Sequence, residues 1–441
     1  MFSRKPDPRA QPSLFGTIMR WLFRLLVVAS ACSLLWIAWW LVATPSYDAL
    51  ERQLIEVAGI DPLRDIAPVE ANQAALAIEA LAAPLGIQIA PQGFEHRASP
   101  SREVAVSFSD VQTKGGELLL ALMKDGTAEV ELPEEVESFL VTHGPVLVEI
   151  RDLLQTSDPS EAPRWELDFR QGGSFQLPFL LGHLYLHELL LLRALTAEEA
   201  QEAVSWVDAA ARLRRGLEGQ LAMIFLLIHQ SELRHEMAVL RRLDVWPTGL
   251  RQDLEGLLAN RTLAEHALTG YRLETWLIFR MMRNGEMQDP GHPAYLRFVT
   301  ERLGRHGIRH QLIATEKMIE PILANGPVGF DPEEQFERGM ATIPEWSLMA
   351  RILTPHVSDV FIKTARTELD IELTLRSAAA QDALVTTQCT NFEPRQPSVI
   401  DGVEWLYGCD DQALVIEPTQ TFDGSVTGAP VLSRFTVTPR G

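Results

Sequence analysis

An uncharged, strongly apolar run near the start of the chain constrains its folding more than any other feature. It extends over nineteen residues from Leu25 to Ala43 and contains no Pro or Gly. As an α-helix rising about 1.5 Å per residue it spans roughly 28 Å, close to the thickness of the hydrocarbon core of a bilayer. The sequence therefore predicts a transmembrane anchor over residues 20–44, with the lipid bilayer as the partner of Leu25 to Ala43.

The charges on either side of this run predict its orientation. Five basic residues and one acid, Asp7, precede it; the basic residues are Arg4, Lys5, Arg9, Arg20 and Arg24. Asp48 and Glu51 follow it, opposed by Arg52. Basic flanks stay on the cytoplasmic side, and Trp36, Trp39 and Trp40 suit the opposite interface. We therefore expect a single-pass protein of the bacterial inner membrane, with a disordered cytoplasmic tail at residues 1–19 and a periplasmic body.

Two other interpretations of the apolar run remain open. A signal peptide could be cleaved near Ala29-Ser30-Ala31, and a lipoprotein signal would place Cys32 after the cut. Cleavage at this point would leave a second apolar run exposed, and Ala29 is a poor match to the Leu usual in a lipoprotein signal. An uncleaved anchor fits the residues better than either.

The charge balance excludes one class of partner. The 441-residue chain has a net charge of −20, and 34 basic residues face 58 acidic ones after residue 44. Nucleic-acid binding needs basic surface that neutralises phosphates, so we expect no nucleic-acid partner.

Hydrophobic periodicity predicts a mainly α fold. The expected architecture is the N-terminal transmembrane helix, a large periplasmic helical bundle or irregular α-solenoid, and a small antiparallel β subdomain at the C-terminus. The corresponding divisions are residues 1–19 (tail), 20–44 (anchor), 45–160 (small α+β or helical subdomain), 161–382 (helical core) and 383–441 (β subdomain). Helices are expected near 46–57, 69–83, 133–154, 177–195, 262–282, 295–304, 308–324, 331–342 and 356–379, with another after 196 and one ending near 243.

Some local signals carry more specific predictions. Val104 to Phe108 and Thr127 to Leu132 are typical of strands. Thr196 to Glu199 matches a capping box, and Arg305 to His310 reads as a basic, solvated turn. Leu177 to Leu195 is long enough for a second span, but His183, His187 and Glu188 favour a buried core helix.

The cysteines predict one disulfide. Cys389 and Cys409 are flanked by segments typical of strands. On the oxidising side of a membrane such a pair commonly forms a bridge, which would contribute roughly 3 kcal/mol of stability in the chain-entropy model.

Four residues are candidate metal ligands. His183 and His187 share one helix face, and Glu232 and His235 form an E-x-x-H pattern further along the chain. Carboxylate-bridged metal bundles use two such patterns, so this set is incomplete, and hydrogen-bonded core histidines explain it as well. No Gly-x-Ser-x-Gly elbow or phosphate-cradling Gly-rich loop occurs, so catalytic residues are not identified and no cofactor is expected.

Several segments together carry a resemblance. They are Asn72 to Ala75, Pro133 to Leu154, Arg164 to Phe169 and Leu181 to Glu218. In these the chain resembles a group of single-span, mostly α-helical bacterial envelope proteins. The resemblance implies an architecture and no reaction, and the chain departs from the group's Pro/Gly-rich β tail at Cys389 and Cys409.

Three functions are open on these residues. The first is a scaffold or accessory interaction module of an envelope assembly, with an envelope protein as partner. An anchored periplasmic hydrolase or metalloenzyme with a site inside the bundle is the second. The third is a ligand-sensing domain, which would need a partner because the cytoplasmic tail is short. An enzyme is the less favoured class.

Overall fold

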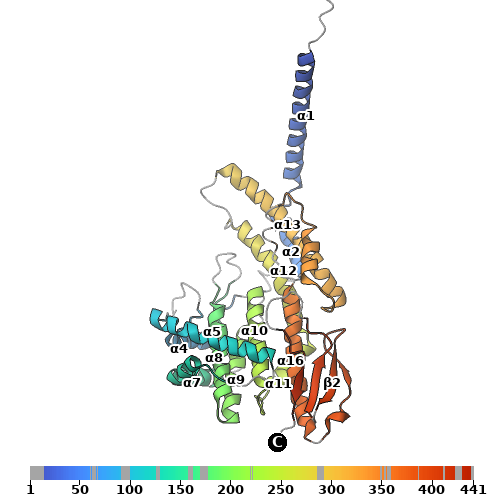
Figure 1. Ribbon diagram of the computed structural model, residues 1–441. Helices are drawn as coiled ribbons and strands as arrows, with labels where there is room; N and C mark the ends of the chain where they lie inside the picture. Colours follow the sequence, from blue (N-terminus) through green and yellow to red (C-terminus); the bar gives the residue numbers. More distant parts are fainter. Residues whose placement is uncertain are drawn as a thin grey trace, which may run out of the picture.

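The chain folds into a mainly helical body with a small antiparallel sheet at its C-terminal end (Figure 1). The computed structural model describes residues 14–59, 61, 66, 68–90, 100–125, 130–156, 162–168, 177–218, 220, 222–285, 293–347, 350–351, 354, 359–385, 387–410, 413–422 and 430–438. This confirms the predicted fold class at the level of a helical body with a C-terminal sheet.

The first two helices connect the N-terminus to the body. Helix α1 spans Leu14–Ala43 and extends away from the other elements, and α2 spans Tyr47–Ala58 (Figure 1). Ser46 begins α2 as predicted, because its hydroxyl accepts the N–H of Ala49 at 3.1 Å and satisfies a free donor of the first turn. The predicted tail is helical from Leu14, and its earlier residues lie outside those described.

The apolar run lies within α1. Over the part of the chain that the structure describes, no helix combines the length and the apolarity needed to cross a membrane. The side chains of residues 36–42, including the tryptophans predicted at the interface, lie outside the described set. The membrane span therefore stays a prediction.

A layer of helices follows: α4 (Gln73–Ala82), the 3₁₀ turn η1 (Ala83–Leu85), α5 (Arg102–Lys124), α6 (Glu134–Thr142) and α7 (Gly144–Thr156). The strand predicted over Val104 to Phe108 is wrong, because these residues lie in α5. A Cβ on Gly115 would lie 2.8 Å from Leu192 Cδ1, so this glycine lets α5 approach α8 closely. Of the other predicted strand, 130–132 is not strand and 127–129 lies outside the described residues.

The central helices are α8 (Leu180–Thr196), α9 (Ala200–Arg215), α10 (Met223–Leu240), α11 (Leu250–Ala259) and α12 (Thr262–Arg283). Leucines of α8 are buried in the main core cluster together with residues of α4 to α12. The predicted capping box is wrong: the Thr196 hydroxyl donates to the carbonyl of Arg193 and ends α8, and α9 starts after Glu199 without a side-chain cap. Helix α11 was not predicted.

Helix α13 (Ala294–Asn325) is one long helix where two were expected, followed by α14 (Pro332–Met340) and α16 (Asp359–Leu384). The solvated turn predicted at Arg305 to His310 is wrong: it lies inside α13, and the buried His306 Nε2 is 3.1 Å from Thr44 Oγ1. A Cβ on Gly304 would lie 2.5 Å from Met282 Sδ, so this glycine lets α13 pack closely on α12.

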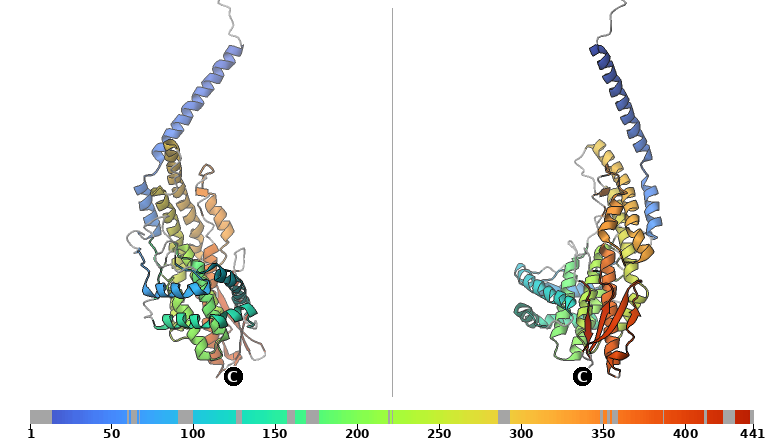
Figure 2. Two further views of the ribbon diagram at one scale, coloured as in Figure 1. Left: turned by 90° about the vertical axis from the view of Figure 1, so that its left-hand side faces the viewer. Right: turned by 45° about the vertical axis from the view of Figure 1, so that its right-hand side comes forward.

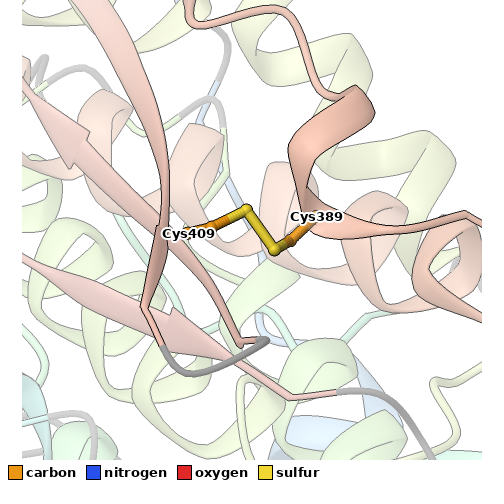
Figure 3. Close-up of a disulfide and its surroundings, with 2 residues drawn as sticks. All are labelled: Cys389 and Cys409. Atoms are coloured by element: carbon orange, nitrogen blue, oxygen red, sulfur yellow. A yellow bond between two sulfur atoms is a disulfide. The ribbon is translucent and has the colours of Figure 1, made fainter.

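The C-terminal sheet contains β1 (Arg395–Pro397), β2 (Glu404–Asp410), β3 (Ala413–Pro418) and β4 (Phe435–Val437), all antiparallel and in chain order. It lies along α16 (Figure 2), and Trp405, Leu414 and Ile416 pack against Leu369 and Leu373 of that helix. Cys389, in the 3₁₀ turn η4 (Cys389–Asn391), forms a disulfide with Cys409 of β2 (Figure 3). The bridge fastens the segment after α16 to the sheet.

Candidate functional site

The four candidate ligands lie in a cluster of polar side chains inside the helical core. We call it the histidine–carboxylate cluster. Its members come from α8, α9, the turn after α9, and α10: His183, His187, Glu188, Arg214, Glu218, His229, Glu232, His235 and Glu236. All are buried except Glu218, whose side chain is 41% exposed. Helices α8 and α10 carry these groups in otherwise apolar segments, because both helices are enclosed by neighbours.

Two histidines of α8 face two glutamates of α10 in register. His183 Nδ1 lies 2.6 Å from Glu232 Oε1, and His187 Nε2 lies 2.9 Å from Glu236 Oε1. Each pair joins residues 49 apart in the sequence, and both partners advance by four residues. Helices α8 and α10 therefore run parallel, with successive turns paired.

Arg214 joins the second pair to a third histidine. Its Nε donates to Glu236 Oε1 at 2.9 Å, and its Nη1 donates to Glu218 Oε1 at 2.8 Å and to His229 Nε2 at 3.0 Å. Burial alone would raise the pKa of Glu236, but the charges of Arg214 and His187 outweigh it and hold the pKa below its usual value. Burial is likewise outweighed at Glu218, whose pKa falls to about 2 through its contacts with His229 and Arg214.

Glu232 is ionised for the same reason. Burial opposes its charge, but the charge and hydrogen bond of His183 prevail, so the pKa of Glu232 is lowered. The rings of His183 and Trp165 also meet edge to face, with their centres 5.1 Å apart. Aromatic packing and a charged partner together fix the orientation of this histidine.

Glu188 and His235 form a different kind of pair. Their nearest atoms, Glu188 Oε1 and His235 Nδ1, are 3.5 Å apart. Burial and the negative charge of Glu232 raise the pKa of Glu188 to about 8. Burial and the charges of His187 and Arg234 lower the pKa of His235 to about 3. Near neutral pH the glutamic acid keeps its proton and the imidazole is uncharged, so no ion pair forms between them.

The four predicted ligands do not converge on one point. His183 contacts Glu232, but His187 contacts Glu236 and His235 faces Glu188. Within the described residues, no group of three or more His, Cys, Asp or Glu side chains is placed to hold a metal ion. Four buried atoms of the two His–Glu pairs nevertheless lack a hydrogen-bond partner among the described residues: His183 Nε2, His187 Nδ1, Glu232 Oε2 and Glu236 Oε2.

A second buried network connects α10 to α16. Arg234 Nε donates to Asp370 Oδ2 at 2.5 Å, and Arg241 Nη1 lies 3.7 Å from Asp370 Oδ1 and donates to Thr374 at 3.0 Å. Arg234 also donates to the carbonyl of Pro430 at 2.9 Å. The network joins the central helices to the C-terminal region.

Sequence reasoning missed Arg214, Glu236 and Asp370. A signal for Glu236 exists: Glu232 and Glu236 have the same spacing of four as His183 and His187, within equally apolar helices. Matched polar spacings on two buried helices indicate side chains that pair with one another, because an unpaired buried charge is costly.

Comparison with family models, curated proteins and solved structures gives no match for this chain. Its function must therefore be argued from its own residues.

Proposed function

We propose that this chain is a single-span protein of the bacterial inner membrane whose periplasmic body is a scaffold or accessory module of an envelope assembly. Helix α1 is the anchor in this proposal, and an envelope protein is the partner. Two observations support the proposal: apolar side chains of α1 are exposed, and the buried charged side chains of the body pair with one another.

The observation that carries the proposal is the exposure of apolar side chains on α1. Ten of them are between 48% and 71% exposed: Met19, Trp21, Leu22, Phe23, Leu25, Leu26, Val27, Val28, Leu34 and Leu35. They include two unbroken runs, Trp21 to Phe23 and Leu25 to Val28, and therefore surround the helix, unlike the single apolar stripe of a surface helix. Such a helix needs an apolar environment outside its own chain.

The flanking charges support the orientation. Arg20 and Arg24 lie at the N-terminal side of the apolar run, and the acidic body follows its other end. Arginine flanks are retained on the cytoplasmic side of a membrane, so the body would lie outside the cytoplasm.

The body has the properties of a rigid support. In the histidine–carboxylate cluster, Glu232 and Glu236 face histidines of a neighbouring helix, and Arg214 joins three other members. The Arg234–Asp370 contact extends this cross-linking to α16. Side chains used in this way hold helices in register and are not displayed to a substrate.

A second candidate function is an anchored metalloenzyme. The unpartnered nitrogen and oxygen atoms of the two His–Glu pairs favour it, because buried polar atoms in native proteins are normally satisfied. Metal analysis of the purified full-length chain decides between the two. Stoichiometric metal in the wild type, lost in His187→Ala, would favour the enzyme.

The first test concerns the anchor. We expect the full-length chain to stay with the membrane pellet after alkaline carbonate extraction. The double variant Leu34→Arg/Leu35→Arg should be released, because each arginine near the centre of the span costs about 2.5–3.5 kcal/mol in a bilayer. The matched control is Val141→Arg, which places arginine at a body residue that is as exposed (71%) as Leu35. Extraction of the wild type would refute the anchor.

The second test concerns the partner. Chemical cross-linking in native membranes, followed by purification and mass identification, should return one envelope protein in a fixed ratio. A chain that stays monomeric at every cross-linker length would refute the scaffold role.

A further inference from the structure

The described residues include an apolar pocket with a buried acid, at the junction of α12, α13 and α16. Its volume is about 220 Å³, and it is remote in sequence from the histidine–carboxylate cluster. Its lining includes Arg261, Glu265, Leu268, Ile322, Phe361 and Glu368. The volume is below the range of about 300–1,000 Å³ typical of drug-sized ligands, so an occupant would be a small molecule.

Glu368 is the distinctive residue of this pocket. Its side chain belongs to a residue that is only 3% exposed, and its buried Oε1 has no hydrogen-bond partner among the described residues. Burial raises the pKa of Glu368 to about 7, because the charge of Arg261 only partly compensates for it and Glu372 adds to it. Ionising a carboxyl group is costly where burial outweighs its charged partners, and a cation in the pocket that donates to the carboxylate reduces that cost.

The other acids buried on α16 each have an arginine as a close partner. Asp370 is held by Arg234, and Glu372 accepts from Arg376 and from the Ser398 hydroxyl. Asp370 Oδ1 also lacks a hydrogen bond among the described residues, but Arg241 Nη1 lies 3.7 Å from it. Glu368 differs from both acids because the charge of Arg261 only partly offsets its burial.

The remaining walls indicate the shape of the ligand. Leu268, Ile322 and Phe361 provide an apolar lining, which suits a short hydrocarbon chain. Thr364, which also lines the pocket, already uses its hydroxyl, because it accepts from Gln230 and donates to the carbonyl of Val360. Glu265 and Arg261 lie exposed at the mouth, where their opposite charges offset each other, so the buried Glu368 is the group that favours a cation.

We propose that this pocket binds a small organic molecule that carries a protonated amine on a short apolar chain, with the amine donating to Glu368 and the chain lying among Leu268, Ile322 and Phe361. A zwitterion could place a carboxylate near Arg261, and a simple alkylamine would leave Arg261 unused. The amine and the apolar chain are common to both.

Isothermal titration calorimetry of the full-length chain in detergent micelles tests this with three related probes. Leucine carries both charged groups, 3-methylbutylamine lacks the carboxylate, and 4-methylpentanoate lacks the amine. At least one amine should bind, and 4-methylpentanoate should not. Weaker binding of leucine in Arg261→Ala, with 3-methylbutylamine unaffected, would support the zwitterion; binding of 3-methylbutylamine alone would support the alkylamine.

The variant Glu368→Gln separates the proposed acceptor from the rest of the pocket. It keeps the size of the side chain and removes its charge, and we expect it to weaken amine binding by about tenfold or more. The matched control is Glu265→Gln, which changes an exposed acid at the mouth and should leave affinity nearly unchanged. A thermal unfolding curve for each variant shows that it is folded.

Three outcomes would overturn the proposal. They are the absence of binding by either amine up to about 10 mM, equal binding of 4-methylpentanoate, and unchanged amine affinity in a folded Glu368→Gln variant.

Discussion

The carboxylates of the histidine–carboxylate cluster and the carboxylate of the α16 pocket are equally hidden from solvent but differ in their partners. Glu232 and Glu236 are fully buried, and each lies within 3 Å of a histidine, with Arg214 also bound to Glu236. Glu368 is buried to a similar extent, yet the charge of Arg261 only partly offsets the effect of its burial. The pKa of Glu232 and of Glu236 is lowered, whereas that of Glu368 is raised.

This difference separates structural charge from charge available to a ligand. Removing one member of a satisfied buried pair leaves its partner uncompensated and lowers the free energy of unfolding. Removing a buried charge that has no close partner should instead raise the free energy of unfolding. The comparison can therefore be tested through stability alone, without knowledge of the ligand.

The largest expected effect is at Arg214. Arg214→Met removes the charge that joins Glu218, His229 and Glu236, and should lower the free energy of unfolding by about 3–5 kcal/mol. Urea unfolding of the full-length chain in micelles, followed by circular dichroism, measures it. The control is Arg212→Met on the same helix, where the partly exposed pair with Asp208 should be worth about 0–1 kcal/mol. Equal losses in the two variants would contradict the role given to the cluster.

The next effect is at Asp370, which lies on the same helix as Glu368. Asp370→Asn leaves the buried Arg234 and Arg241 without their carboxylate and should cost about 2–4 kcal/mol. Asp382→Asn is the control, because Asp382 also lies on α16 and faces Arg251 at 3.4 Å in an exposed pair. A stability change at Asp370 no larger than that at Asp382 would show that burial does not distinguish these acids.

The general fold was predictable because it follows from hydrophobic periodicity. The start of α2 at Ser46 and the extent of α12 needed only capping and pattern rules. Errors arose where tertiary packing outweighed a local signal. The strand expected over Val104 to Phe108 and the break expected between residues 304 and 308 both lie inside helices, α5 and α13. In these helices the missing Cβ of Gly115 and of Gly304 lets a side chain of a neighbouring helix approach. The sequence around a glycine does not show which neighbouring helix will pack against it.

The two polar sites differ in how far the sequence could predict them. His183, His187, Glu232 and His235 were identified from helical spacing, and the matched spacing of Glu236 could have added a fifth residue. Their assignment as metal ligands depended on a convergence that the helix register does not provide. The pocket draws Arg261, Ile322 and Glu368 from three helices far apart in the chain, so spacing rules could not bring them together.

The smallest expected effect, and the one that decides the comparison, is a gain of stability in Glu368→Gln. A carboxyl group whose pKa is raised in the folded state stabilises the fold below its unfolded pKa. That stability is lost as the pH rises through the folded pKa. For Glu368 the window runs from the ordinary value of 4.5 to about 7. Glutamine cannot ionise, so the stability advantage of the variant over the wild type should grow by about 1–3 kcal/mol between pH 5 and pH 8.

Urea unfolding at several pH values measures this difference, with Glu265→Gln at the exposed mouth as the control expected to show none. A loss of stability in Glu368→Gln, of the kind expected for Asp370→Asn, would mean that the fold itself satisfies Glu368. The contrast between the two regions would then fail, and Glu368 would no longer support the proposal that the pocket binds an amine. A gain that grows with pH would instead show that the folded chain keeps an ionisable acid at a stability cost that a cationic ligand can relieve.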